Sequence, residues 1–139
     1  MTYLDALQAA LAAEHATIQV LGYLGAQTSP ASDPGLRETL REAYLVHRDR
    51  RDQLVERVRA AGAEPAAAAA AYELPELGAG GPAAVREAAL RLERDCGRTY
   101  GFLVASSPSD RRRWAIDALL DSALRELGLG GRPRAYPGR

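Results

Sequence analysis

The sequence contains no lysine, a single cysteine, two histidines and few aromatic residues, and each scarcity excludes a class of protein. Without lysine, the chain itself cannot form a Schiff base or use a lysine nucleophile. The single cysteine, Cys96, excludes a disulfide framework within the chain and suits a reducing compartment. With only His15 and His47, one chain cannot build a zinc site from three histidines.

Long apolar runs and an excess of positive charge are also absent. No run of about 18 apolar residues occurs, so the sequence predicts no membrane span. The N-terminus lacks the basic and apolar segments of a secretion signal, and we expect a cytoplasmic protein. Lys+Arg and Asp+Glu each number 18, and this balance argues against nucleic acid as a partner. A hydrophobic fraction of 47% over 139 residues is typical of one folded domain.

Helical periodicity is the strongest pattern that the sequence does contain. Apolar residues recur at steps of three and four in four segments, over about 2–26, 33–62, 82–106 and 107–128. Thr2 and Asp5 form a capping box at the first start, and Asp33 before Pro34 marks the second. Ser107 to Asp110 supply a cap, a proline and an acid for the fourth. We expect residues 1–128 to fold and residues 129–139, rich in Gly, Pro and Arg, to form a flexible tail.

The connecting segments predict how these helices are arranged. Short connectors join the first helix to the second and the third to the fourth, so each pair packs antiparallel. Residues 63–81 are numerous enough to run back along the bundle, which places the second and third helices parallel. The run Ala66–Ala71 within this segment has the composition of a short helix. The sequence therefore predicts an all-α four-helix bundle of two antiparallel hairpins joined by a long crossover.

A weak internal repeat supports two equivalent halves. Residues 6–26 and 85–105 align without gaps and share seven identical positions. The informative matches are the non-alanine ones, among them Glu14 with Glu93 and Gly22 with Gly101. The repeat indicates that the first and third helices are counterparts.

Polar residues interrupt the apolar stripes near the midpoints of the helices. Glu14, His47 and Glu93 each hold such a position. Because the midpoints of helices of similar length lie at one height, we predict that these residues meet in one central polar layer. A buried carboxylate must be protonated, paired, hydrated or bound to a cation. Other candidates for the layer or its surroundings are Tyr44, Arg50 or Arg51, Tyr100, Asp117 and Asp121.

Several short motifs resemble those of one superfamily. They are Glu14-His15-Ala16 with Gly22-Tyr23 after it, the run from His47 to Asp52, Tyr72-Glu73-Leu74-Pro75, and Glu93 with Tyr100. Together they resemble the ferritin-like superfamily, and in particular a bacterial ferritin-like domain family of unknown function. The resemblance covers Leu4 to about Leu127 and implies a ferritin-like four-helix bundle.

The ferritin-like di-iron pattern takes one Glu from helices one and three and a Glu-x-x-His from helices two and four. Glu14 and Glu93 match the single-Glu positions and His47 matches one histidine, but Tyr44 stands in place of a carboxylate. The fourth helix has no histidine, and Asp117 and Asp121 are its only carboxylates near the middle. A complete di-iron oxidase centre is therefore not expected.

Two functions remain open from the sequence. The first is a single Fe, Mn or Zn ion bound by Glu14, His47 and Glu93, with Asp117 or water as a further ligand. The second is a non-catalytic bundle with a metal-free polar layer that forms a homodimer or binds a partner protein. Tyr44, Arg51, Tyr100 and Asp121 are expected around the layer in either case, and Cys96 is expected to be a buried, inert thiol. A third, less favoured reading is a small-molecule pocket at the glycine-lined helix ends, and Arg111 to Arg113 are a candidate contact for an anionic partner.

Overall fold

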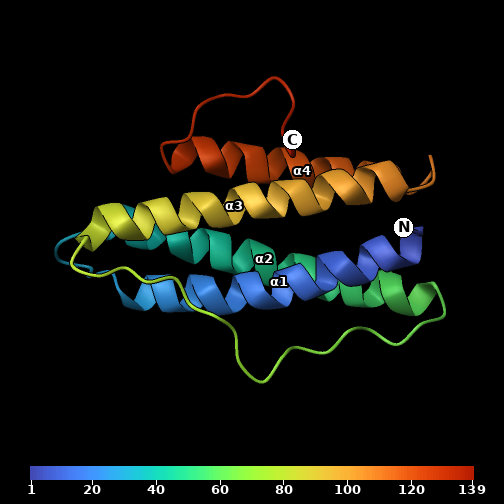
Figure 1. The fold of residues 1–139 in the computed structure, drawn as a ribbon, viewed down its shortest axis with the longest axis horizontal. Helices are drawn as coiled ribbons and strands as arrows, with labels where there is room; N and C mark the ends of the chain where they lie inside the picture. Colours follow the sequence, from blue (N-terminus) through green and yellow to red (C-terminus); the bar gives the residue numbers. More distant parts are fainter.

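The computed structural model describes residues 1–139 and contains four α-helices. These are α1 (Tyr3–Ala26), α2 (Pro34–Ala60), α3 (Gly81–Ser106) and α4 (Arg112–Gly128). Figure 1 shows α1 and α2 as one antiparallel hairpin, α3 and α4 as the second, and α2 parallel to α3. The predicted all-α bundle of two hairpins with a long crossover is confirmed. No helix combines the length and the apolar character that crossing a bilayer requires.

The helix ends follow the predicted signals at three of the four starts. The capping box at α1 is present, with Thr2 N donating to Asp5 Oδ2 over 2.9 Å and Asp5 N donating to Thr2 Oγ1 over 3.1 Å. The predicted start of the fourth helix at Ser107 is wrong, because α4 begins at Arg112. Ser107 instead ends α3, since its hydroxyl donates to Leu103 O over 2.6 Å.

The crossover between α2 and α3 is irregular chain with turns at both ends and contains no helix, so the short helix considered for the alanine run does not form. Six residues cover about 9 Å as a helix but about 20 Å when extended, and the crossover has to return along the whole bundle (Figure 1). Polar side chains of α1 hold it in place. Gln8 Nε2 donates to Glu64 O over 2.7 Å, and His15 Nε2 lies 2.9 Å from Ala66 O.

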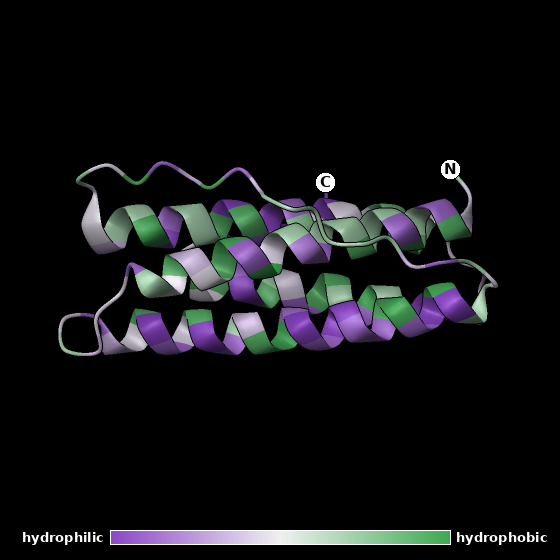
Figure 2. Ribbon diagram, turned by 90° about the horizontal axis from the view of Figure 1, so that it is seen from below, coloured by the Kyte–Doolittle hydropathy of each residue, from purple (hydrophilic) through white to green (hydrophobic).

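The apolar core is divided into two clusters. Each helix carries apolar and polar residues on different faces, which appear as alternating green and purple along the ribbon in Figure 2. One cluster fills the half of the bundle that contains the N-terminus and includes Leu7, Leu11, Leu54, Tyr100 and Leu103. The other fills the opposite half and includes Leu21, Leu24, Leu36, Leu40 and Val85. Six buried polar residues lie where the two clusters meet: Glu14, Thr17, His47, Arg50, Glu93 and Ser122.

The segment after α4 turns back over the second hairpin. Leu129 is buried in the core, and Arg134 Nη2 lies 2.8 Å from the buried carboxylate of Glu126. Gly138 reaches the helical glycine Gly101, where a Cβ atom would lie 3.3 Å from Gly138 O. The glycine therefore gives the returning chain room to approach α3. The mobility of residues 129–139 in solution stays a prediction.

Candidate metal centre in the central polar layer

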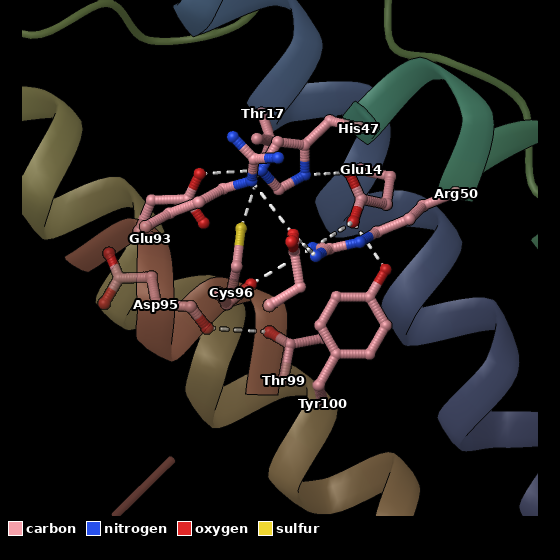
Figure 3. A network of polar contacts seen from close by, with 12 residues as sticks. Glu14, Thr17, His47, Arg50, Glu93, Asp95, Cys96, Thr99 and Tyr100 are labelled. Atoms are coloured by element: carbon pink, nitrogen blue, oxygen red, sulfur yellow. Dashed lines mark hydrogen bonds and ion pairs between the residues drawn. The ribbon is translucent and has the colours of Figure 1, made fainter. Parts of the chain in front are cut away.

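His47 stands at the middle of α2 between two carboxylates from different helices. Its Nδ1 lies 2.6 Å from Glu14 Oε2 of α1, and its Nε2 lies 2.9 Å from Glu93 Oε1 of α3 (Figure 3). All three side chains are at most 1% exposed. As predicted, three polar residues lie together at one height in the interior of the bundle: Glu14, His47 and Glu93.

The two contacts determine the charge of the imidazole. Burial alone would lower the pKa of His47, but the hydrogen bonds and negative charges of Glu14 and Glu93 outweigh it and raise the pKa to about 9. The ring is therefore an imidazolium at neutral pH, and each of its N–H groups donates to one carboxylate. Each carboxylate has the neighbour that an ionised buried acid requires.

The second oxygen of Glu14 has its own partners. Tyr100 OH donates to Glu14 Oε1 over 2.5 Å, and Arg50 Nη1 lies 3.9 Å from the same oxygen. Burial raises the pKa of Tyr100, and the charge of Glu14 raises it further, so the phenol stays protonated and donates. Glu14 is consequently held on three sides, by an imidazolium, a phenol and a guanidinium.

Arg50 connects the layer to α4. Its Nη1 donates to Ser122 Oγ over 3.1 Å, its Nη2 donates to Asp121 Oδ2, and its guanidinium lies over the Tyr100 ring at 5.1 Å from the centroid. Asp121 also accepts from Arg125 Nε over 2.9 Å. The buried layer thus has two carboxylates, Glu14 and Glu93, and two cations, His47 and Arg50, so its charges balance without a bound ion.

Cys96 belongs to the layer rather than to the apolar stripe alone. Its Sγ lies 3.3 Å from Thr17 Oγ1, and burial raises the pKa of the thiol well above its usual range. One ligand atom each from His47, Glu93 and Cys96 lie within 4.8 Å of one another. A nitrogen, an oxygen and a sulfur ligand at this spacing form a group that can hold a transition-metal ion.

Glu93 carries the one polar atom of the layer that is left over. Its Oε2 is buried and has no hydrogen-bond partner, whereas the other oxygen faces His47 (Figure 3). A buried carboxylate oxygen without a partner costs roughly 1–3 kcal/mol, and an ion or water commonly accounts for such an atom. The unpartnered atom belongs to one of the three residues that can hold a metal.

Other residues predicted for the site lie elsewhere. Asp117 is on the solvent face of α4, where its side chain is 57% exposed and pairs with Arg113 at 3.0 Å, so it is not brought to the layer. Tyr44 lies beside Gly22 with the Arg48 guanidinium over its ring, and Arg51 pairs with Asp52 near the surface. Of the two candidate arginines, Arg50 is the one that enters the layer.

Sequence reasoning left out Cys96 and Thr17 as members of the layer, although a simple spacing finds them. Each follows a central residue by three positions, Thr17 after Glu14 and Cys96 after Glu93, as Arg50 follows His47. Residues three apart lie on the same side of a helix one turn along. Thr17 and Cys96 also align in the internal repeat, so their contact joins counterparts of α1 and α3.

The arginines at the start of α4 are engaged within the chain. Arg112 donates to Ser107 O over 2.9 Å, Arg113 pairs with Asp117, and Arg111 lies over the Tyr3 ring at 5.8 Å from the centroid. The side chains of Arg111 and Arg113 are nevertheless 55% and 85% exposed, and their contact with an anionic partner stays a prediction.

Comparison with known proteins gives a family and a solved fold but no activity. Residues 6–139 match a family described as "Domain of unknown function (DUF4439)". The crystal structure of a conserved hypothetical protein, Rv2844, from Mycobacterium tuberculosis superposes with a TM-score of 0.81 at 32% sequence identity. The match covers 91% of this chain and 92% of that one. No curated protein matches the chain.

Proposed function

The chain belongs to the DUF4439 family, and we propose that it binds one divalent transition-metal ion at the centre of the bundle through His47, Glu93 and Cys96. The observation that carries the proposal is the unpartnered Glu93 Oε2, buried in a group whose three ligand atoms lie within 4.8 Å. The ligand set replaces the one predicted from sequence, since Cys96 takes the place of Asp117 and Glu14 becomes a positioning residue.

Glu14 supports the imidazole from the side opposite to Glu93. Its Oε2 accepts from His47 Nδ1 over 2.6 Å, which leaves Nε2 as the nitrogen that faces Glu93 and is available to an ion. Metal-binding histidines commonly donate their second N–H to a carboxylate in this way, which fixes the ring and raises its basicity. Tyr100 and Arg50 hold Glu14 in turn, so the support is itself rigid.

The donor set favours some ions over others. Thiolate and imidazole ligands favour zinc or iron over manganese, magnesium and calcium, which prefer oxygen ligands. An ion at this place would polarise an oxygen ligand as a Lewis acid, or exchange an electron if it is iron. Binding requires a neutral imidazole nitrogen and a thiolate, so two protons leave when a divalent ion enters and the net charge of the layer is unchanged.

The two-hairpin arrangement and the paired glutamates of α1 and α3 support the resemblance to the ferritin-like superfamily. A two-metal centre does not fit these residues. Tyr44 replaces a carboxylate, α4 has no histidine, and the Arg50 guanidinium occupies the space beside Glu14 and Asp121 where a second ion would need oxygen ligands. We therefore propose a single ion and no di-iron oxidation chemistry.

Metal content and cobalt spectroscopy test the proposal. Protein purified without chelator or affinity metal should contain, or take up on titration, one zinc ion per chain. Co²⁺ should give a thiolate-to-cobalt absorption band that Cys96→Ser abolishes, and His47→Ala should lose the ion. Asp117→Asn is the matched control and should bind as the wild type does, since Asp117 pairs with Arg113 outside the layer. A folded wild-type chain that takes up no ion contradicts the proposal.

A second candidate function is a metal-free bundle that forms a homodimer. Two observations favour it: the charges of the layer balance without an ion, and three large side chains of α4 are exposed in one stripe. Leu120, Leu124 and Leu127 are 50%, 67% and 43% exposed. Their spacing places them on one side of the helix, where a second copy of the chain could pack. Light scattering should then give twice the chain mass of 14.9 kDa, and Leu124→Glu should return it to the monomer value.

A further inference from the structure

A cavity of about 300 Å³ lies beside the polar layer and is bordered by all four helices. Its walls are partly apolar, with Leu21, Leu40 and Ala89 among them. Its polar lining residues are Thr39, Glu42, Glu93, Asp121 and Arg125. Since one water takes about 30 Å³ of liquid, the space is large enough for a small ion with its hydration shell.

The inner wall of this cavity contains Glu93, the residue with the unpartnered oxygen. Glu93 is as deeply buried as Glu14, His47 and Cys96, all at most 3% exposed, but of these four residues it alone lines the cavity. The cavity therefore approaches the proposed ligands at Glu93.

The outer wall contains a carboxylate without an ion pair. Glu42 of α2 is exposed, and no cation lies within salt-bridge distance of it, in contrast to Glu38 one turn earlier, which pairs with Arg41 at 3.5 Å. Asp121 also borders the cavity and is shared by Arg50 and Arg125. Three carboxylates and one guanidinium line the cavity, and Glu42 is the one of these carboxylates without a cationic partner. Its unpaired negative charge on the exposed side of the cavity attracts cations.

We infer that this cavity is the passage through which a hydrated divalent cation reaches the centre of the bundle. Glu42 would bind the cation at the entrance of the passage and Glu93 at its inner end. The inference rests on the proposed metal site and adds its route of loading and the residues that control it. Glu42 attracts the hydrated ion, and the free oxygen of Glu93 is the first ligand that the ion meets on the way to His47 and Cys96.

A plug in the passage should change rates and leave affinity unchanged. Thr39 is half-buried on the cavity wall, and Thr39→Trp fills the space without replacing any of the proposed ligands. Stopped-flow loading of metal-free protein with Co²⁺, and release into excess chelator, should both slow about tenfold in this variant. The dissociation constant and the thiolate-to-cobalt band should be those of the wild type.

Removing the outer charge should change loading selectively. Glu42→Gln should slow Co²⁺ uptake several-fold, and the difference from the wild type should disappear at high salt because surface charges are then screened. Glu38→Gln is the matched control, since Glu38 is an exposed acid of the same helix that does not line the cavity.

The outcomes separate the passage from the metal site. A wild-type chain that binds Co²⁺ while Thr39→Trp and Glu42→Gln load at the wild-type rate overturns the passage and leaves the metal site standing. A folded wild-type chain that binds no Co²⁺ at all overturns both. If Glu38→Gln slows loading as much as Glu42→Gln does, the effect comes from general surface charge, and this too contradicts the passage.

Discussion

At the scale of single residues, the layer is organised by one repeated step of three positions. Glu14 and Thr17, His47 and Arg50, and Glu93 and Cys96 each place two polar groups on the inner side of one helix. The first member of each pair contributes to the His47 contacts, and the second closes the layer one turn further along. Polar groups that would be costly alone are thereby satisfied by neighbours from other helices, with Glu93 Oε2 as the exception.

The raised pKa of His47 predicts how stability depends on pH in chelator-treated protein. The pKa of His47 is about 9 in the folded chain and near 6.5 in the unfolded chain, so the folded chain holds the proton on the imidazole more tightly. Its contribution is therefore fully present below about pH 6.5 and is lost as the pH rises to 9, on the order of 3 kcal/mol in total. Urea unfolding across this range should show the loss, and His47→Gln should flatten the profile. An equally steep profile in His47→Gln would assign the dependence to other groups.

Arg50 and its sequence neighbour Arg51 form a matched pair for a stability measurement. Arg50→Met leaves Glu14 and Asp121 without the guanidinium that neutralises them, and we expect a loss of about 3–5 kcal/mol. Arg51→Met removes a surface pair with Asp52 and should change stability by about 0.5 kcal/mol or less. Urea denaturation of both variants measures the difference. Equal effects would show that the buried guanidinium has no special role.

At the scale of helices and connectors, local signals predicted most of the fold. The capping box at Thr2, the Pro34 start and the position of Gly62 correspond to ends of α1 and α2, because caps act within one turn. The prediction that the fourth helix starts at Ser107 is wrong, because a serine hydroxyl can bond to the end of one helix as readily as it caps the start of the next. The alanine run does not form the short helix that its composition favours, for a different reason. Helix propensity is weak in a short segment, and a helix would shorten a crossover that has to span the length of the bundle.

The central site was predictable only in part. Helix midpoints placed Glu14, His47 and Glu93 correctly, because a midpoint depends on element length and not on exact rotation. Rotation about the axis decides whether Asp117 or Asp121 faces inward, and neither lies on a clear apolar stripe. Asp117 consequently pairs with Arg113 one turn away, whereas Asp121 reaches Arg50. Periodicity alone does not predict whether a residue at the edge of an apolar stripe faces the interior or the solvent.

Two glycines predict opposite results from one substitution. A Cβ atom added at Gly25 in α1 would meet no atom within 4 Å, and its φ is not positive, so Gly25→Ala should stabilise the chain by about 0.5–1 kcal/mol. Gly62 follows α2 with φ +81°, and Gly62→Ala should destabilise it by roughly 1–2 kcal/mol. Thermal unfolding followed by circular dichroism measures both. A gain in Gly62→Ala would mean that the turn after α2 relaxes at no cost.

At the scale of the whole molecule, the polar layer lies between two apolar halves that pack separately. The crossover tied to α1 by Gln8 and His15 covers one hairpin, and the residues after α4 return over the other. Both irregular segments therefore contact helices through specific polar or glycine positions. The composition of residues 129–139 predicts a flexible tail. The ion pair between Arg134 and Glu126 instead predicts a tail that is held against the second hairpin.

Shortening the chain after Gly131 decides between these two expectations for the tail. Glu126 is 3% exposed, and both of its oxygens accept from Arg134 Nη2 at 3.0 and 2.8 Å, whereas its other cation, Arg94, lies 3.6 Å away. Truncation leaves this buried carboxylate with its weaker partner alone. We expect a loss of roughly 1–3 kcal/mol, seen as several degrees in Tm, and Arg134→Ala should reproduce most of it. Arg132→Ala, at an exposed arginine of the same segment without an ion pair, should leave Tm unchanged. If truncation and Arg134→Ala behave like Arg132→Ala, the tail is a mobile appendage and Arg94 is sufficient for Glu126.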